Sequence, residues 1–205
     1  MRKSLFAAAL TAAAAIPVLA QMPTTIPGAK DPSRVKAGTY TVDGAHTQVM
    51  WRVNHLGFND YFGIFGEPKG TLTLDPVKPS AATVQIEIPI SSVATNSKGL
   101  TEHLLKADFF EAVEFPTATF KSTSVAVNGT EAKISGDLTI KGVTKPVVID
   151  AEFAGAGVCP MNKKDTIGFH GRTKIKRSDF GISYGIPFVP DEVPLEISVA
   201  FEKTA

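Results

Sequence analysis

Apolar and polar residues alternate with a period of two along much of the chain, which is typical of β-strands with one buried face. The alternation is clearest in residues 133–153. Ile134, Leu138 and Ile140 share one face of the first strand, and Lys141-Gly142 then breaks the pattern. The second strand carries on one face Val147, Ile149, Ala151 and Phe153. These residues predict a β-hairpin with its turn near Gly142.

Other segments alternate in the same way, and together they give about eight strands. Each has one apolar face, and the segments span 49–55, 70–74, 84–90, 118–127, 167–175 and 193–201. Asn128-Gly129 is a further hairpin signal. Alternation on one face favours an antiparallel sheet with one solvated side, which must pack on another sheet or close on itself. The pattern therefore predicts an all-β fold and leaves sandwich and barrel both open.

A short segment departs from the β pattern. Leu100 and Leu104 lie at helical spacing within residues 97–107, with Leu105 beside them, and predict one short helix. A second helical turn is expected at 176–180. There, Ser178 or Asp179 is expected to cap the turn, and Gly181 to give the backbone freedom to enter the next strand.

The N-terminus has the composition of a secretory signal peptide. Arg2 and Lys3 precede an apolar, alanine-rich run at 5–16 that is too short to span a bilayer as a helix. We expect residues 1–20 to be removed by cleavage after Ala20, with a retained membrane anchor as the alternative. Residues 21–37, with several prolines, are expected to form an extended, mobile lead-in to one domain at 38–205.

The charge of the chain excludes one class of partner. Without Arg2 and Lys3, the 21 basic residues fall to 19 against 20 acidic ones. A protein so close to neutrality is not expected to capture nucleic acid by charge.

Cys159 is the only cysteine, so no internal disulfide forms. Its position in a glycine-rich stretch indicates an incidental loop cysteine, with a reactive thiol as the alternative.

Candidate catalytic residues are few. His46, His55, His103 and His170 are scattered without the spacing of a metal site, and no nucleophile or phosphate-binding motif is present. The sequence therefore predicts no catalytic residue, no metal and no cofactor. An enzyme with His55 or His103 as acid–base group remains a weaker alternative.

The inward apolar stripes are the remaining candidate site, because an eight-stranded barrel is just wide enough to be filled or to hold one slender ligand. The thirteen residues expected to line it are Trp51, Val53, Leu72, Ile86, Ile88, Phe120, Leu138, Ile140, Ile149, Phe153, Phe169, Ile197 and Val199. The same residues would also suit an ordinary filled core, so the pattern alone leaves both interpretations open.

The amino-acid sequences of several segments resemble those of one protein family. GDLTIKGVTKPV at 136–147 resembles the signature of the YceI family, the lipocalin-like, polyisoprenoid-binding periplasmic proteins of bacteria. Further matches follow the family's order along the chain: 43–47, 54–58, 103–104, 108–110, 115–120, 177–182 and 191–193.

The resemblance implies an extended eight-stranded antiparallel lipocalin-like barrel in the periplasm. It also implies a hollow interior that holds a polyisoprenoid, a quinone or another long-chain amphiphile, for transport or storage. A homodimer is compatible with the resemblance, whereas nucleic acid and a stable membrane anchor are not expected. A structural or stress-related barrel without a ligand stays the alternative, and a lipid-modifying enzyme is a weaker one.

Overall fold

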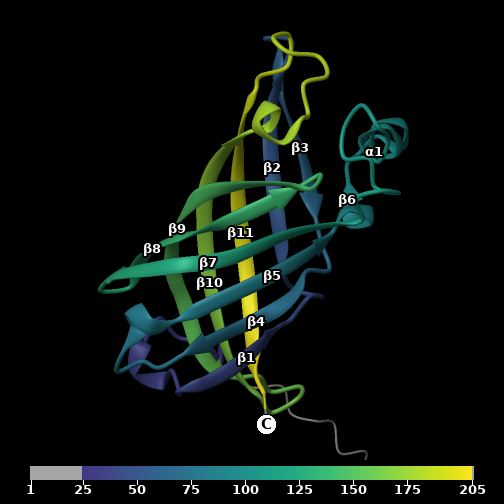
Figure 1. The fold of residues 1–205 in the computed structure, drawn as a ribbon. Helices are drawn as coiled ribbons and strands as arrows, with labels where there is room; N and C mark the ends of the chain where they lie inside the picture. The colour runs from purple at the N-terminus through teal and green to yellow at the C-terminus, as the bar shows by residue number, and fades with distance from the viewer. Residues whose placement is uncertain (1–24, 205) are drawn as a thin grey trace, which may run out of the picture.

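Eight long antiparallel strands run up and down one barrel, and three of them are interrupted (Figure 1). The computed structural model describes residues 25–204, which contain eleven strand segments and one α-helix. The sheet closes where β1 (Gly38–Val42) pairs with β11 (Glu192–Lys203). The barrel predicted from the family resemblance is therefore confirmed.

The interrupted strands explain why eleven segments make eight strands. β1 continues as β2 (Gln48–His55), β4 (Lys69–Leu74) follows β3 (Asn59–Phe65), and β6 (Val93–Ala94) follows β5 (Thr83–Pro89). In the lower half of the barrel β4 pairs with β1 and β5, whereas in the upper half β3 pairs with β2 and β6. The interruptions thus give the barrel a lower and an upper half, in which different strand segments pair.

The five uninterrupted strands supply the rest of the wall: β7 (Thr117–Asn128), β8 (Glu131–Ile140), β9 (Val143–Val158), β10 (Asp165–Lys176) and β11. β11 pairs with β10 along its length, with β2 near its start and with β1 near its end. It therefore runs from the upper end of the barrel to the lower end, beside the C-terminus (Figure 1).

The predicted hairpin between β8 and β9 is confirmed. Ile140 pairs with Val143 across a two-residue turn, in which Lys141 and Gly142 have φ of 49° and 72°. Two central residues with positive φ are typical of the turns that match the twist of a hairpin. Pro146 is the fourth residue of β9.

Both expected helical segments are present. α1 (Lys98–Leu104) begins after Ser97, whose side chain accepts a hydrogen bond from the Leu100 N–H, and it lies beside the upper half of the barrel (Figure 1). The turn at Arg177–Phe180 is a 3-10 helix, and Gly181 follows it at φ 76°. The expected capping by Ser178 or Asp179 was wrong, because the N-cap residue is Lys176 and its side chain makes no capping hydrogen bond. Ser178 instead bonds to Asp191 across the loop.

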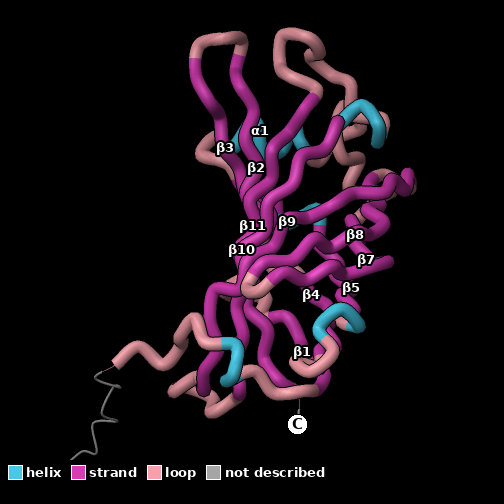
Figure 2. Tube along the Cα trace, turned by 90° about the vertical axis from the view of Figure 1, so that its left-hand side faces the viewer, coloured by secondary structure: helices cyan, strands magenta, loops and turns pink. Residues whose placement is uncertain are grey.

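The expected N-terminal lead-in lies partly within the described residues. Ala29 pairs with Ala156 of β9, and the Lys36 ammonium lies 2.8 Å from Asp165. These contacts hold residues 29–36 against the lower half of the barrel, whereas the first described residues project away from it (Figure 2). The predicted signal peptide at 1–20 lies outside the described residues. Among the described residues no helix is long and apolar enough to cross a membrane.

The buried side chains form separate clusters in the two halves. Tyr40, Ile167 and Phe201 are almost fully buried in the lower half, around the place where the barrel closes. In the upper half, Phe180 packs with Ile90 and Ile182, and Leu104 of α1 packs with Trp51. The apolar clusters surround the barrel axis without filling it, and this leaves room for the cavities described next.

Candidate ligand-binding cavities

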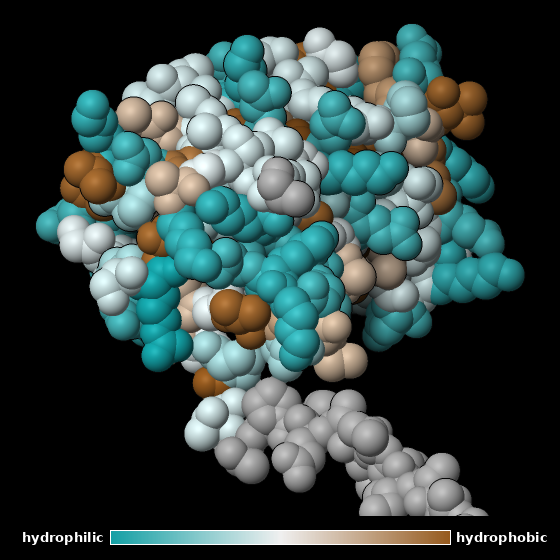
Figure 3. Space-filling model, turned by 90° about the horizontal axis from the view of Figure 1, so that it is seen from below, coloured by the Kyte–Doolittle hydropathy of each residue, from teal (hydrophilic) through white to brown (hydrophobic). Residues whose placement is uncertain are grey.

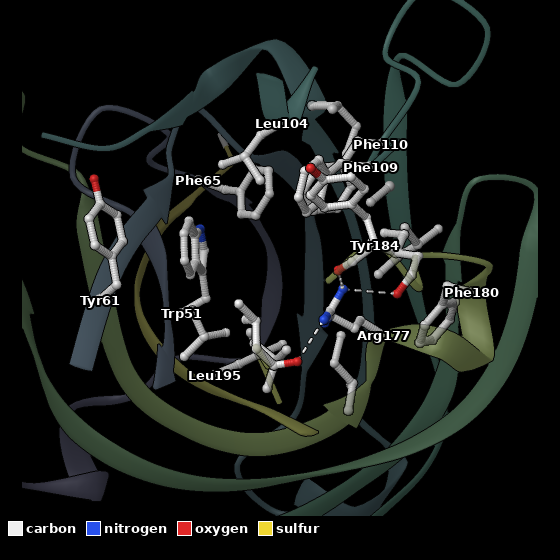
Figure 4. Close-up of a pocket in the computed structure, with 18 of the residues that line it drawn as sticks. Trp51, Tyr61, Phe65, Leu104, Phe109, Phe110, Arg177, Phe180, Tyr184 and Leu195 are labelled. Carbon is white, nitrogen blue, oxygen red and sulfur yellow. Dashed lines mark hydrogen bonds between the residues drawn. The ribbon is translucent and has the colours of Figure 1, made fainter. Parts of the chain in front are cut away.

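The upper half of the barrel encloses a cavity of about 600 Å³ (Figure 4). Strands β2, β3, β10 and β11 form one wall, and α1 with the loop after it forms another. The loop 181–191, between the 3-10 turn and β11, completes the enclosure. The side chains labelled around it in Figure 4 are mostly apolar or aromatic: Trp51, Tyr61, Phe65, Leu104, Phe109, Phe110, Arg177, Phe180, Tyr184 and Leu195.

A second cavity of about 340 Å³ occupies the lower half. Its lining comes mainly from β4, β5 and the strands β7 to β11, and is also largely apolar. Four apolar side chains border both cavities: Val49, Ile88, Leu138 and Leu195. The two cavities therefore adjoin at this ring of four residues, at mid-height in the barrel.

The structure places all thirteen predicted lining residues around these cavities. Trp51, Val53 and Ile140 border the upper cavity. The lower cavity is bordered by Leu72, Ile86, Phe120, Ile149, Phe153, Phe169, Ile197 and Val199. Ile88 and Leu138 border both. The position of these residues is thus as the alternation implies, whereas their contact with a ligand stays a prediction.

Several lining residues were missed by the sequence analysis. Tyr61 and Phe65 point inward from β3, on the face that they share with Gly63, but Phe62 and Ile64 on the opposite face are also apolar, so alternation did not reveal the inward side. Phe109, Phe110 and Tyr184 come from loops, which have no period to reveal an inward face. The Phe109 and Tyr184 rings lie 5.4 Å apart between centroids, so the two loops meet over the cavity.

Arg177 is the buried cation of the upper cavity. Its Nε donates to the Pro190 carbonyl at 2.9 Å, and its two terminal nitrogens donate to the carbonyls of Ile182, Tyr184 and Val189. Burial lowers the pKa of this guanidinium, while the nearby Asp191 carboxylate acts in the opposite direction. The guanidinium therefore fixes the loop 182–190 as part of the cavity wall.

Trp51 also places a nitrogen atom in the apolar wall of the upper cavity. Its ring stacks against Tyr61 with centroids 6.4 Å apart, and it lies over Gly63 on the neighbouring strand. Its Nε1 is buried and has no hydrogen-bond partner within the described residues. Because Trp51 is also the single tryptophan of the chain, its fluorescence reports directly on this cavity.

The histidines are only partly brought together. His55 and His103 border the upper cavity, and His103 Nε2 lies 2.9 Å from an Asp108 carboxylate oxygen. His46 instead pairs with Asp43 at 2.7 Å. In residues 25–204, no group of three His, Cys, Asp or Glu side chains could hold a metal ion.

Comparison with known proteins identifies the family. The model of the YceI-like domain family matches residues 40–201. The chain belongs to the YceI family. A YceI protein of Escherichia coli O157:H7 is 42% identical over 165 residues, which cover 80% of this chain and 86% of the relative. The resemblance inferred from the sequence motifs is thereby confirmed.

Solved structures of YceI-like barrels agree with the fold. Burkholderia cenocepacia BcnA superposes with a TM-score of 0.70 at 27% identity, covering 78% of this chain and 98% of BcnA. A domain from Saccharophagus degradans, named as polyisoprenoid-binding, gives a TM-score of 0.62 at 17% identity, covering 82% of this chain and all of that domain. At this identity the second likeness concerns the fold alone.

Proposed function

We propose that this YceI protein binds one long-chain amphiphile of the polyisoprenoid class along the axis of its barrel. The observation that carries the proposal is the pair of adjoining apolar cavities, of about 600 and 340 Å³. Ligand cavities in proteins are typically about 300–1,000 Å³ and mostly apolar. A chain that passes the ring at Val49, Ile88, Leu138 and Leu195 would occupy both cavities at once.

The energetics suit a ligand with a long apolar tail and a small polar group. Removing apolar surface from water contributes roughly 25 cal/mol per Å², so each isoprene unit that enters adds to the affinity. The polar side chains at the upper cavity are few, and Arg177 already donates to four carbonyls. Affinity would therefore rise with chain length, and the head group would contribute less.

Two observations support an isoprenoid ligand and a location in the periplasm. The Saccharophagus domain with the same fold is named as polyisoprenoid-binding, and this favours an isoprenoid as the ligand here. The signal-like sequence at 1–20 supports export to the periplasm, where a carrier or store would shield such a chain from water. We propose binding rather than catalysis, because the wall of the cavity is dominated by apolar side chains.

The alternatives are a barrel without a ligand and a lipid-modifying enzyme. The two cavities count against a solid barrel, since their lining would otherwise be packed to the density of an interior. The pair of His103 and Asp108 beside the upper cavity is the one feature that would favour an acid–base enzyme. If the protein turned over a bound lipid and His103→Ala abolished this turnover, the protein would be a lipid-modifying enzyme and our proposal would be wrong.

Organic extraction of the purified protein, followed by mass spectrometry, tests the proposal directly. The delipidated protein is then titrated with an isoprenoid quinone and a fatty amide, and quenching of Trp51 reports binding. Val53→Phe should weaken binding because it fills part of the upper cavity, whereas Val148→Phe on the exposed side of β9 should not. An empty protein that binds neither probe would refute the proposal.

A further inference from the structure

Two loop tips at the upper end of the barrel expose large apolar side chains. Phe58, in the turn between β2 and β3, is 84% exposed, and Phe188, in the loop before β11, is 73% exposed. Leu56 beside Phe58 is also exposed. Both tips project from the same end of the molecule, opposite the C-terminus (Figures 1 and 2). Exposed apolar side chains gathered at one place indicate an interaction surface.

These tips border the upper cavity. His55 and Asn59, on either side of the first tip, line the cavity, and so do Tyr184 and Val189 of the second. Tyr184 also has more than half of its surface exposed. The exposed apolar side chains of the two tips are therefore adjacent to the rim of the upper cavity.

Neither tip carries a charged side chain that would lose its hydration on entering a bilayer. Residues 55–59 and 182–190 contain no Lys, Arg, Asp or Glu. The flanking Asp60 lies 3.2 Å from Arg52. Asp191, directly after the second tip, is held by Ser178 near the Arg177 guanidinium, and Glu192 lies 2.9 Å from Lys174. The end thus offers apolar and aromatic groups without an excess of either charge, which fits an uncharged lipid surface better than an anionic one.

The lower end of the barrel differs from the upper one. Seen from below, it is covered mainly by hydrophilic side chains with scattered apolar ones (Figure 3). Val77 and Met161 are as exposed as the two phenylalanines, at 83% and 78%. They are neighbours of charged residues in sequence, such as Lys78 and Lys163. Isolated apolar side chains of this kind are ordinary on protein surfaces.

We propose that the two tips at 55–59 and 182–190 dock the protein on the surface of an uncharged lipid bilayer, with the mouth of the upper cavity facing the lipid. Phe58 and Phe188 would enter the interfacial layer, where aromatic side chains are favoured. An amphiphile could then pass between bilayer and cavity without crossing water. The docking does not depend on the function proposed above, whereas the movement of an amphiphile between bilayer and cavity does.

Flotation with phosphatidylcholine vesicles tests the docking. The protein is purified after export from a bacterial host, so that all variants carry the same processed N-terminus. The double variant Phe58→Ser/Phe188→Ser should lower the vesicle partition coefficient at least tenfold, whereas Val77→Ser/Met161→Ser should leave it unchanged. Binding should persist at high salt, because no charge attraction is involved. Equal partition of the two double variants, or a need for anionic lipid, would overturn the proposal.

Two further measurements separate this proposal from others. Both double variants should bind a soluble short-chain amphiphile as the wild type does, because none of the four residues lines a cavity. A protein that floats with vesicles but binds no amphiphile would retain the docking and refute the proposed function. A protein that binds amphiphiles but never floats would retain the proposed function and refute the docking. If light scattering showed the tips joining two copies that do not float, they would be a dimer contact and the docking would be refuted.

Discussion

Trp51 on β2 and Gly63 on β3 are paired across the strands, and the glycine leaves the space that the indole occupies. A Cβ atom added at 63 would lie 2.1 Å from Trp51 Cζ2 and 2.4 Å from Cε2. Since two carbon atoms cannot approach so closely, the side chain of Trp51 depends on the lack of one at 63. This pair therefore sets the position of the ring in the wall of the upper cavity.

We expect Gly63→Ala to displace the indole of Trp51 and reshape the upper cavity. Overpacking of this kind costs about 1–3 kcal/mol of unfolding free energy, which urea denaturation would measure. The emission of Trp51 should shift, and affinity for a long amphiphile should fall. Gly66→Ala is the matched control, because a Cβ there meets nothing within 4 Å. Identical emission spectra of the two variants would contradict the prediction.

Val49→Phe should divide the interior at the ring where the two cavities adjoin. A long polyisoprenoid needs both cavities, so its affinity should fall at least tenfold, while a short amphiphile that fits the upper cavity should bind as before. Competition between the two ligands, followed by native mass spectrometry, measures the ratio. Val148→Phe makes the same chemical change on the exposed side of β9 and should not alter it. Equal loss for both chain lengths would argue against a shared channel.

The sequence predicts the barrel wall well because a strand reveals its inward face through a period of two. Ile88, Leu138 and Phe120 were placed correctly for that reason. Closure of the sheet, in contrast, depends on pairing between β1 and β11, which lie at opposite ends of the chain. Alternation is local and carries no information about such pairing, so the barrel rested on the family motifs.

The upper cavity was harder to predict, since much of it comes from irregular segments. Phe110 and Tyr184 lie in loops, whose inward positions are set by tertiary contacts alone. Arg177 was placed only within a helical turn at 176–180, because turn chemistry does not show which side chain of the turn faces the interior. Only the fold brings the four carbonyls that compensate its charge to the guanidinium.

Arg177→Lys should destabilise the loop 182–190 although the charge is kept. Lysine has one compact donor group and cannot reproduce the planar arrangement that satisfies four carbonyls. Carbonyls left without a partner cost about 1–3 kcal/mol each when they are buried, and we expect a total loss of that order or more. Urea denaturation measures it, and proteolysis within 182–190 should become faster. Arg172→Lys, at an exposed position on β10, should change neither quantity. An unaltered loop in Arg177→Lys would show that the guanidinium does not hold it.

Asp191 should give the fold a specific acid sensitivity. Its carboxylate accepts hydrogen bonds from the Ser178 hydroxyl at 2.7 Å and the Ser178 N–H at 2.8 Å. These bonds favour the ionised form and hold the pKa of Asp191 below its usual value. Their contribution to stability is therefore present above the pKa of the unfolded chain, about 3.9, and is lost as the pH falls through the lower folded value.

Asp191→Asn isolates this contribution from that of other carboxylates. The variant should be less stable than the wild type at pH 7, and the difference in unfolding free energy should shrink as the pH is lowered towards 2. Ser178→Ala removes only the hydroxyl bond, so its pH-dependent difference should be smaller. Urea denaturation at a series of pH values measures both. A constant difference between wild type and Asp191→Asn at pH 7 and pH 2.5 would show that ionisation of Asp191 does not stabilise the loop, because only a carboxylate bound more tightly in the folded state makes the difference vary with pH.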